Sequence, residues 1–180
     1  MRKAGRVTQQ HDSPRRKLIR WQGFRYGGGA SYFVTICTAH RRPLLGTVDL
    51  DGHVHETPAG KIVRETWQGI SVRFPSVHLQ AFVAMPDHLH AVLTIGGDPD
   101  AAEPQGNAIL SRVVGAMKSI SAIGINREQG VTGQHVWQAR FHDRVIRDED
   151  EFAHLCWYVE DNPNRWVSTR RSTDDVGRRT

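Results

Sequence analysis

Two histidines separated by one apolar residue, His88 and His90, lie within the apolar run AFVAMPDHLHAVLTI at 81–95. Side chains alternate faces along a β-strand, so an extended backbone places both imidazoles on one face and Leu89 in the core. Two imidazoles one pleat apart can share a metal ion. The spacing therefore predicts a metal-ligating pair on one face of a sheet, with ordinary strand histidines as the alternative.

A tyrosine and an amide far downstream complete a candidate reaction centre. Tyr158 and Asn162 are four positions apart in WYVEDNP at 157–163, and on a helix they would share one face. Tyr158 falls at the border of the apolar stripe that this helix would bury, which is formed by Phe152, Leu155, Cys156 and Val159. The pattern leaves open an exposed tyrosine whose hydroxyl faces solvent. Two histidines, an amide and a tyrosine nucleophile together predict a metal-assisted site that nicks DNA.

The histidine spacing occurs a second time, at His53 and His55. This pair lies in DGHVHETP, a turn region without a long apolar strand around it. We expect these two histidines to lie on the surface. Three residues match such a pattern easily, so it is the surroundings rather than the spacing that favour His88 and His90.

Length and charge indicate one folded domain between two basic segments. The chain has 180 residues and a net charge of +5, which is concentrated at its ends. Residues 1–25 carry eight Lys or Arg against one Asp, and residues 164–180 carry five Arg against two Asp. We expect a basic N-terminal arm over 1–25, a catalytic domain over 26–167 and a basic tail over 168–180.

The basic residues predict contacts with nucleic acid, because they attract a phosphate backbone, although such charge also serves solubility. Aromatic residues between the arginines of the arm can stack on bases or anchor the arm to the core. Arg112 and Lys118 can face DNA or lie on a solvated helix face. The predicted nucleic-acid contacts are Arg15, Arg16, Lys17, Arg20, Trp21, Arg25, Arg112 and Lys118.

The composition also indicates a location. The basic N-terminus lacks the apolar segment of a secretion signal, and no apolar stretch is expected to reach the roughly 18–20 residues that span a membrane. We therefore expect a cytoplasmic protein without a membrane segment. Cys37 and Cys156 lie in apolar surroundings, and we expect buried, reduced thiols.

Local patterns predict the elements that must position the site. The predicted strands are 31–38, 76–85, 88–95 and 136–146, with a short hairpin that turns at Asp51-Gly52. The predicted helices are 58–73 after the N-cap Thr57, 109–126, and a last helix from the capping pair Asp148 and Glu151 to about Asp161, before Pro163. Loops are expected over 96–106 and 128–134. The order is that of the split βαβ, ferredoxin-like fold with one added helix. We therefore expect an α+β protein with an antiparallel sheet, helices on one face and a C-terminal helix that carries the tyrosine.

Four blocks of the sequence resemble, in the same order, the REP-associated tyrosine transposases, a group of insertion-sequence-type single-strand transposases with the HUH fold. The blocks are FVTICTAHRRPLLG, AFVAMPDHLHAVLTI, VWQARFHDRVIRDEDEF and YVEDNPNRW, and the resemblance covers roughly residues 15–167. It implies a single-strand DNA endonuclease and strand transferase. Such an enzyme would recognise hairpins of repeated palindromes and cut beside them, as a monomer or a homodimer, without a small-molecule cofactor.

The resemblance also implies roles for individual residues. His88 and His90 would hold a divalent ion, Mg²⁺ or Mn²⁺. Tyr158 would form a 5′-phosphotyrosine link, and Asn162 would complete the metal site. The family usually reads Met-Pro-Asn-His, whereas this chain has Asp87, whose extra carboxylate can strengthen cation binding or misorient a ligand.

Two other functions fit the same residues. A hairpin DNA- or RNA-binding protein without cleavage activity would use the same fold and arms, and Asp87 is the feature that favours it. A metal-dependent hydrolase of another substrate would need a base that activates water, for which Asp87 and Glu151 are the candidates near the metal. The combination of Tyr158 and Asn162 with the histidine pair favours the nuclease.

Overall fold

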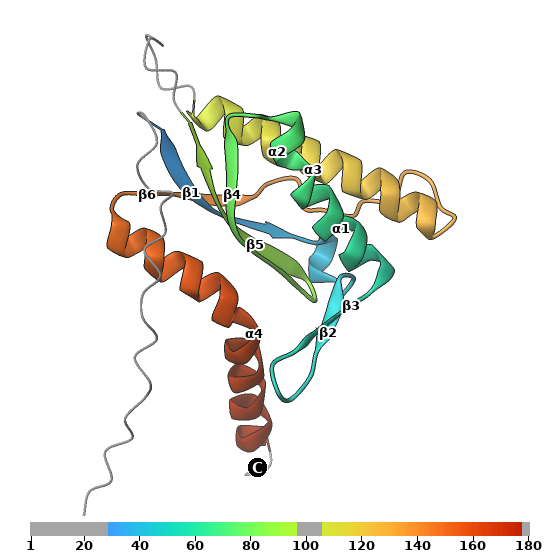
Figure 1. Ribbon diagram of the computed structural model, residues 1–180. Helices are drawn as coiled ribbons and strands as arrows, with labels where there is room; N and C mark the ends of the chain where they lie inside the picture. Colours follow the sequence, from blue (N-terminus) through green and yellow to red (C-terminus); the bar gives the residue numbers. More distant parts are fainter. Residues whose placement is uncertain (1–28, 97–105, 178–180) are drawn as a thin grey trace, which may run out of the picture.

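The computed structural model describes the chain over residues 29–96 and 106–177 (Figure 1). Most of the predicted loop 96–106 lies outside the described residues. So does the predicted N-terminal arm, with the candidate nucleic-acid contacts Arg15, Arg16, Lys17, Arg20, Trp21 and Arg25.

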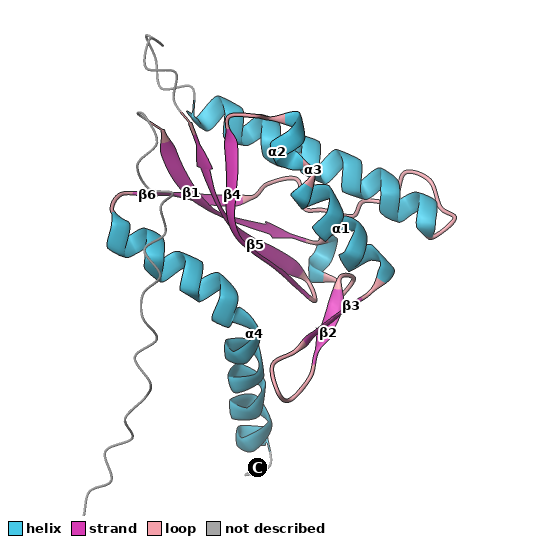
Figure 2. Ribbon diagram, viewed as in Figure 1, coloured by secondary structure: helices cyan, strands magenta, loops and turns pink. Residues whose placement is uncertain are grey.

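A four-stranded antiparallel sheet forms the centre of the domain (Figure 2). Its strands are β1 (Ala30–Cys37), β4 (Val77–Met85), β5 (His88–Ile95) and β6 (His142–Ile146), in the order β4-β5-β1-β6. With the helices that connect them, these strands follow the split βαβ pattern. The α+β, ferredoxin-like architecture predicted from the sequence is confirmed.

Helices cover both faces of the sheet, as Figure 1 shows. α1 (Pro58–Gln68), α2 (Ile70–Arg73) and α3 (Gly106–Glu128) lie on one face, and α4 (Glu149–Gly177) crosses the other. Because side chains alternate along each strand, the sheet separates two cores. The larger core, beneath α1 and α3, includes Val34, Ile36, Val63, Trp67, Leu89, Leu93, Leu110 and Met117. The smaller core, beneath α4, consists of Ala81, Val92, Ile146, Phe152, Leu155, Cys156 and Val159.

The hairpin and the start of α1 follow the local chemistry of the sequence. β2 (Gly46–Val48) and β3 (Val54–Glu56) pair through the predicted turn, where Gly52 takes a φ of 82° that glycine adopts without steric cost. Thr57 caps α1, because its hydroxyl oxygen accepts the Gly60 N–H at 3.1 Å. These two predictions are confirmed, although the predicted helix is divided at Gly69 into α1 and α2.

The predicted strand 136–146 is wrong in its first half. Only residues from His142 onward pair with β1, and the earlier part contributes a single bridge between Trp137 and Thr38. Lys118 gives the physical reason, because its ammonium group donates to three successive backbone carbonyls and holds this segment out of the ladder. The acceptors are the carbonyls of Gln138, Ala139 and Arg140, at 2.9, 3.2 and 3.1 Å.

The predicted end of the last helix before Pro163 is also wrong. α4 begins as expected, with the Asp148 carboxylate accepting the Glu151 N–H at 2.8 Å, but the helix runs through the proline to Gly177. A proline inside a helix removes one backbone hydrogen bond and bends the helix rather than always ending it. Figure 1 shows this bend in the middle of α4. The boundary expected between 167 and 168 therefore falls within a helix.

The expectation that no segment is long and apolar enough to cross a membrane needs correction. α3 passes that test by length and composition alone, because few charged side chains interrupt its 23 residues. A core helix passes the same test, and α3 buries Leu110, Val113, Val114, Met117, Ser121 and Ile125. The helix is therefore weak evidence for a membrane segment, and the location of the protein stays a prediction.

Both cysteines are free and buried, as the sequence predicts. Burial raises the pKa of the Cys37 thiol, and it raises that of Cys156 to about 12. Thiolates are the reactive form of cysteine, so neither side chain is suited to nucleophilic chemistry near neutral pH.

Candidate active site

The two histidines of β5 point to the face that α4 covers. Each histidine is 7% exposed, and the ring Nε2 atoms lie 3.1 Å apart. The sheet register places His90 between Val83 of β4 and Thr35 of β1. Leu89 points to the opposite face and is fully buried in the larger core. The strand geometry predicted from the alternation is therefore present.

A different partner binds the Nδ1 atom of each ring. The Asp87 carboxylate contacts His88 Nδ1 at 2.5 Å, and the Thr35 hydroxyl contacts His90 Nδ1 at 2.8 Å. With both Nδ1 atoms engaged, the two Nε2 atoms are the ring nitrogens that face one another. Nitrogens about 3 Å apart suit two adjacent ligands of one ion, since metal–imidazole bonds are roughly 2.1 Å long.

α4 brings the tyrosine and the amide over the histidines. The Tyr158 ring lies 5.6 Å from that of His90, edge to face, and Phe33 stacks on His90 from the sheet at 5.2 Å. Asn162 is 6% exposed and lies one helical turn beyond Tyr158. Seven side chains from β5 and α4 line one cavity of about 390 Å³: His88, His90, Tyr158, Asn162, Arg165, Trp166 and Thr169.

The surroundings keep both imidazoles neutral near pH 7. Burial, together with the charge that His88 would carry, lowers the pKa of His90 to about 3. Burial also lowers the pKa of His88, although the Asp87 carboxylate opposes this shift. A neutral imidazole offers a lone pair to a metal ion, whereas a protonated one repels it. The donor set of two neutral imidazoles and a nearby amide therefore fits a divalent cation.

No family model matches the sequence. An uncharacterized protein of Haemophilus influenzae is 27% identical over 175 residues, which cover 88% of this chain and 94% of that protein. Among solved structures, a REP-associated tyrosine transposase bound to a REP hairpin matches with a TM-score of 0.52 and 22% identity, over 78% of this chain and 71% of the other. The chain has the fold of that transposase. A provisionally assigned transposase from Deinococcus radiodurans matches with a TM-score of 0.45 and 18% identity, over 78% of this chain and 94% of the other.

Within this fold, Glu151 lies on the other side of Tyr158 from the cavity that His88 and His90 line. It lines a second hollow, of about 420 Å³, together with Phe33, Thr35, His142, Asp143, Arg144, His154, Leu155 and Tyr158. The Glu151 carboxylate pairs with Arg144 and accepts the backbone N–H of Arg147 at 2.9 Å. Glu151 therefore supports the start of α4, the helix that carries Tyr158.

The two predicted nucleic-acid contacts on α3 lie on the face of the sheet opposite the histidines. Arg112 stacks over the Phe74 ring at 5.9 Å, and the Lys118 ammonium group is engaged with the carbonyls described above. Their contacts with nucleic acid stay predictions. The structure gives Lys118 a structural role.

Four residues that the sequence pattern missed contribute to the site. Thr35 and Phe33 come from β1, which pairs with β5 but is 55 positions from it in the chain. Arg165 and Trp166 come from the part of α4 beyond Pro163, and the Arg165 guanidinium lies 5.2 Å from the Tyr158 ring centroid. A helix continued past the proline would have placed both on the same stripe as Asn162.

The second histidine pair is exposed, as predicted. The side chains of His53 and His55 are 74% and 64% exposed, and both contact the Asp49 carboxylate, at 3.5 and 2.8 Å. Asp49, Asp51 and His53 place potential metal-ligand atoms within 4.8 Å of one another. Hydrogen bonds from the His55 ring and from the His53 backbone N–H to the Asp49 carboxylate lower the pKa of Asp49 to about 2.

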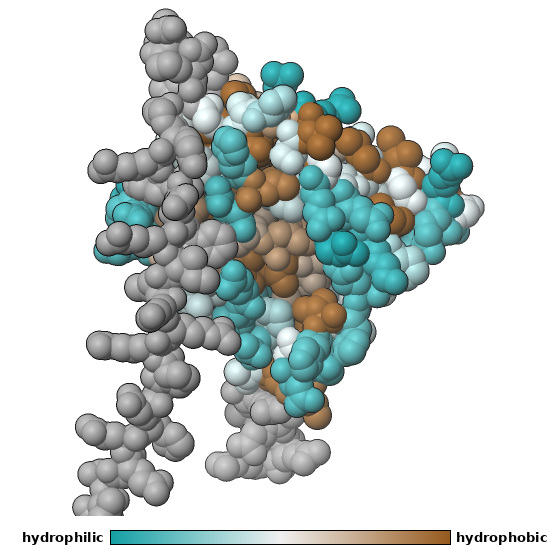
Figure 3. Space-filling model, viewed as in Figure 1, coloured by the Kyte–Doolittle hydropathy of each residue, from teal (hydrophilic) through white to brown (hydrophobic). Residues whose placement is uncertain are grey.

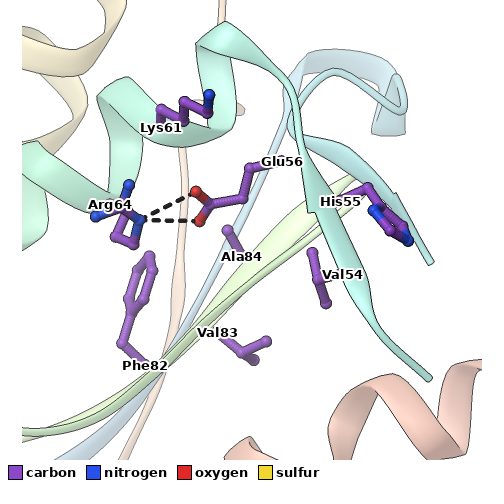
Figure 4. Close-up of a pocket in the computed structure, with 8 residues that line it drawn as sticks. All are labelled: Val54, His55, Glu56, Lys61, Arg64, Phe82, Val83 and Ala84. Atoms are coloured by element: carbon purple, nitrogen blue, oxygen red, sulfur yellow. Dashed lines mark hydrogen bonds and ion pairs between the residues drawn. The ribbon is translucent and has the colours of Figure 1, made fainter. Parts of the chain in front are cut away.

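A separate hollow beside this hairpin carries none of the groups of the candidate active site. Figure 3 shows apolar side chains gathered in the middle of this face of the molecule, between hydrophilic ones. The hollow is lined by Val54, His55, Glu56, Lys61, Arg64, Phe82, Val83 and Ala84. Figure 4 shows the Glu56 carboxylate facing Arg64 Nε, with both oxygens in contact at 3.2 and 3.0 Å. This ion pair fastens β3 to α1.

Proposed function

We propose that this protein is a metal-dependent single-strand DNA endonuclease and strand transferase of the REP-associated tyrosine transposase type. The observation that carries the proposal is the convergence of His88, His90, Tyr158 and Asn162 on one cavity, with the two Nε2 atoms 3.1 Å apart. The fold shared with a transposase that was solved bound to a REP hairpin supports it. A hairpin formed by a repeated palindrome is therefore the proposed substrate.

In the proposed reaction, Tyr158 is the nucleophile. Its hydroxyl oxygen attacks the scissile phosphorus, and the bond to the 3′-oxygen of the upstream nucleotide breaks. The proton lost by the tyrosine balances the proton gained by the leaving 3′-oxygen. The products are a 5′-phosphotyrosine and a free 3′-hydroxyl, and the reverse step rejoins a strand without ATP because the covalent link retains the phosphodiester bond.

His88, His90 and Asn162 would hold the divalent ion, Mg²⁺ or Mn²⁺, in the cavity that they line with Tyr158. When bound, the ion neutralises charge on the non-bridging phosphate oxygens as a Lewis acid. Arg165, close to the Tyr158 ring, adds positive charge on the same side of the helix. The buried position of both imidazoles excludes water, which strengthens these electrostatic contacts.

The surroundings of Tyr158 suit an unpaired strand. The tyrosine borders two hollows, one with the metal ligands and one with Phe33 and the polar side chains of β6. A single strand that crosses the tyrosine can place its backbone at the metal ligands and a base against the aromatic ring. A paired duplex is too stiff to be splayed in this way.

The contacts of the acidic residues support a nuclease over a hydrolase that uses a carboxylate base. Asp87 is engaged with His88 and Arg41, and Glu151 with Arg144 and Arg147. Both carboxylates therefore have structural partners, which leaves the tyrosine as the nucleophile of the site.

The test is cleavage of labelled single-stranded hairpins taken from the repeated palindromes of the genome that encodes the protein. Wild type is expected to cut in Mg²⁺ or Mn²⁺ and to form a protein–DNA adduct stable to denaturation, and EDTA is expected to abolish both. Tyr158→Phe should bind the hairpin but lose the cut and the adduct. Tyr32→Phe is the matched control, because Tyr32 is buried and packs in the core on the opposite face of the sheet.

A hairpin-binding protein without cleavage would give a different result. In that case wild type would bind tightly, and neither metal would produce a cut or an adduct. Cleavage that persists in Tyr158→Phe would instead indicate a hydrolase with another nucleophile.

A further inference from the structure

The two histidines of the site have partners of different chemical kinds. Asp87 offers His88 a carboxylate, which can only accept a hydrogen bond. Thr35 offers His90 a hydroxyl, which can either donate or accept. A neutral imidazole carries one N–H, on Nδ1 or on Nε2, and its partner decides which. The two rings are therefore under different constraints.

Asp87 is held firmly in place. Its backbone carbonyl accepts both the N–H and the hydroxyl of Thr38, each at 2.9 Å. The other carboxylate oxygen contacts Arg41 at 3.5 Å. His40 and Arg41 take left-handed φ values of 56° and 53°, a conformation that costs energy in residues other than glycine. The Asp87 carboxylate contacts His88 Nδ1, which must then carry the proton and leave Nε2 as a lone pair.

Thr35 leaves His90 free to change. It lies directly opposite His90 in the β1–β5 ladder, so the hydroxyl stays near Nδ1 whichever atom carries the proton. The Thr35 hydroxyl can donate to Nδ1 when the His90 proton is on Nε2, and it can accept from Nδ1–H when that proton is on Nδ1. The two arrangements differ in the ring nitrogen that carries the His90 proton, which relocates by exchange with solvent, and in the orientation of one hydroxyl hydrogen.

We propose that Asp87 and Thr35 are positioning residues that let this site exchange an internal hydrogen bond for a cation without changing the number of protons on either ring. Without a cation, the Thr35 hydroxyl donates to His90 Nδ1, His90 Nε2–H donates to His88 Nε2, and His88 Nδ1–H donates to Asp87. With a cation, the same His90 proton resides on Nδ1 and is accepted by Thr35, and both Nε2 lone pairs face the ion. This inference rests on the metal site of the proposed function.

The direct test is the position of the ring protons, which ¹⁵N-detected histidine NMR resolves. Wild type in EDTA is expected to show His88 as the Nδ1–H form and His90 as the Nε2–H form. Saturation with Mg²⁺ should convert only His90. In Thr35→Val, the Mg²⁺-bound His90 would have a buried N–H without an acceptor, so conversion should need more Mg²⁺. Thr94→Val is the matched control, because Thr94 projects to the same face of β5 and its hydroxyl contacts that of Ser31, at 2.9 Å, rather than a histidine ring.

Calorimetric titration with Mn²⁺ gives a second readout. Loss of an outer partner of a metal-binding histidine typically weakens metal binding by about 10–100-fold, and we expect this loss for Asp87→Ala. Asp87→Asn keeps an oxygen that can accept from His88 Nδ1–H, so it should rescue most of the affinity. Glu65→Ala, an exposed carboxylate on α1 at the opposite face of the sheet, should leave the affinity unchanged.

Some outcomes would overturn the inference alone. They are an Nε2–H on His88 in EDTA, no change of His90 with Mg²⁺, or equal Mn²⁺ affinities for wild type and Asp87→Ala. In each of these cases cation binding itself, and with it the proposed nuclease, would still stand. If wild type bound Mn²⁺ no better than His90→Ala, both the inference and the metal dependence of the proposed function would fail.

Discussion

The chain contains the same three-residue pattern twice, and the two copies have opposite surroundings. His53 and His55 lie on a short exposed hairpin, where Asp49 contacts both rings. His88 and His90 lie on a central strand, are 7% exposed, and direct two Nε2 atoms at each other. Asp49 contacts both exposed rings and Asp87 contacts the His88 ring of the buried pair, so neither the spacing nor a nearby carboxylate distinguishes the two pairs.

The difference lies in what surrounds each pair. The buried pair has a strand on each side, which fixes the rings through Thr35 and Phe33, and a helix above, which adds Tyr158 and Asn162. The exposed pair has a two-stranded sheet and solvent. A reactive site here depends on side chains from elements far apart in the chain, all of which converge on one pair of nitrogens.

The largest expected effect separates the two pairs by activity. His90→Ala removes one of three proposed metal ligands, so hairpin cleavage should fall by about 100- to 1,000-fold, as for other groups that stabilise charge in a transition state. His55→Ala should leave cleavage unchanged. The measurement is the single-turnover rate on a labelled hairpin at saturating Mn²⁺. Equal losses in the two variants would mean that the surroundings of the pairs do not matter.

The next largest effect tests the packing of α4, the helix that covers His88 and His90 and leaves His53 and His55 exposed. Phe152 is fully buried where α4 packs on the sheet, and Phe152→Ala should destabilise the protein by about 3–5 kcal/mol. The free energy of unfolding in urea measures this loss. Trp157 of the same helix is 45% exposed, so Trp157→Ala should lower the free energy of unfolding far less. If Phe152→Ala lowered the free energy of unfolding only slightly, the packing of α4 on the sheet would not depend on this core.

Hydrophobic alternation predicted β1, β4 and β5, and hence the ferredoxin-like sheet, because a buried strand must place its apolar side chains at fixed intervals. Two predicted element boundaries were wrong, because contacts with parts of the chain outside the local pattern determine them. The segment before β6 is bound by Lys118 from α3, a contact of residues 20 to 22 positions apart that no local pattern contains. α4 continues through Pro163 because one missing hydrogen bond does not outweigh packing on both sides of the bend.

The candidate site was predictable where its residues share one element and not where they meet across elements. His88 with His90, and Tyr158 with Asn162, each follow from the period of a strand or a helix. Thr35 could not be assigned, since its contact with His90 depends on the register of two strands. Arg165 and Trp166 were missed because the helix was expected to end before them.

A smaller effect distinguishes the pairs by the pH dependence of stability. The pKa of His90 is about 3 in the folded protein, below its ordinary value near 6.5, so the unfolded chain binds a proton that the folded one does not. The contribution of His90 to the free energy of unfolding is therefore fully present above about pH 6.5 and decreases as the pH is lowered toward 3. In EDTA, His90→Gln should show a shallower loss of unfolding free energy between pH 7 and pH 4 than wild type. His55→Gln should follow wild type, and parallel curves for all three proteins would contradict this expectation.

The smallest effect concerns Asp49, the carboxylate of the exposed pair. Hydrogen bonds from His55 and from the backbone of His53 hold its pKa at about 2, below the ordinary 3.8. The stability it contributes is present above about pH 4 and is lost as the pH falls toward 2, in a more acidic window than that of His90. Because the group is exposed, Asp49→Asn should lower the Tm only slightly at pH 7, and about 0.5 M salt should reduce the difference further. Mn²⁺ affinity should be unchanged, in contrast to Asp87→Ala. A loss of Mn²⁺ affinity in Asp49→Asn would place cation binding on the hairpin and would remove the distinction between the two pairs.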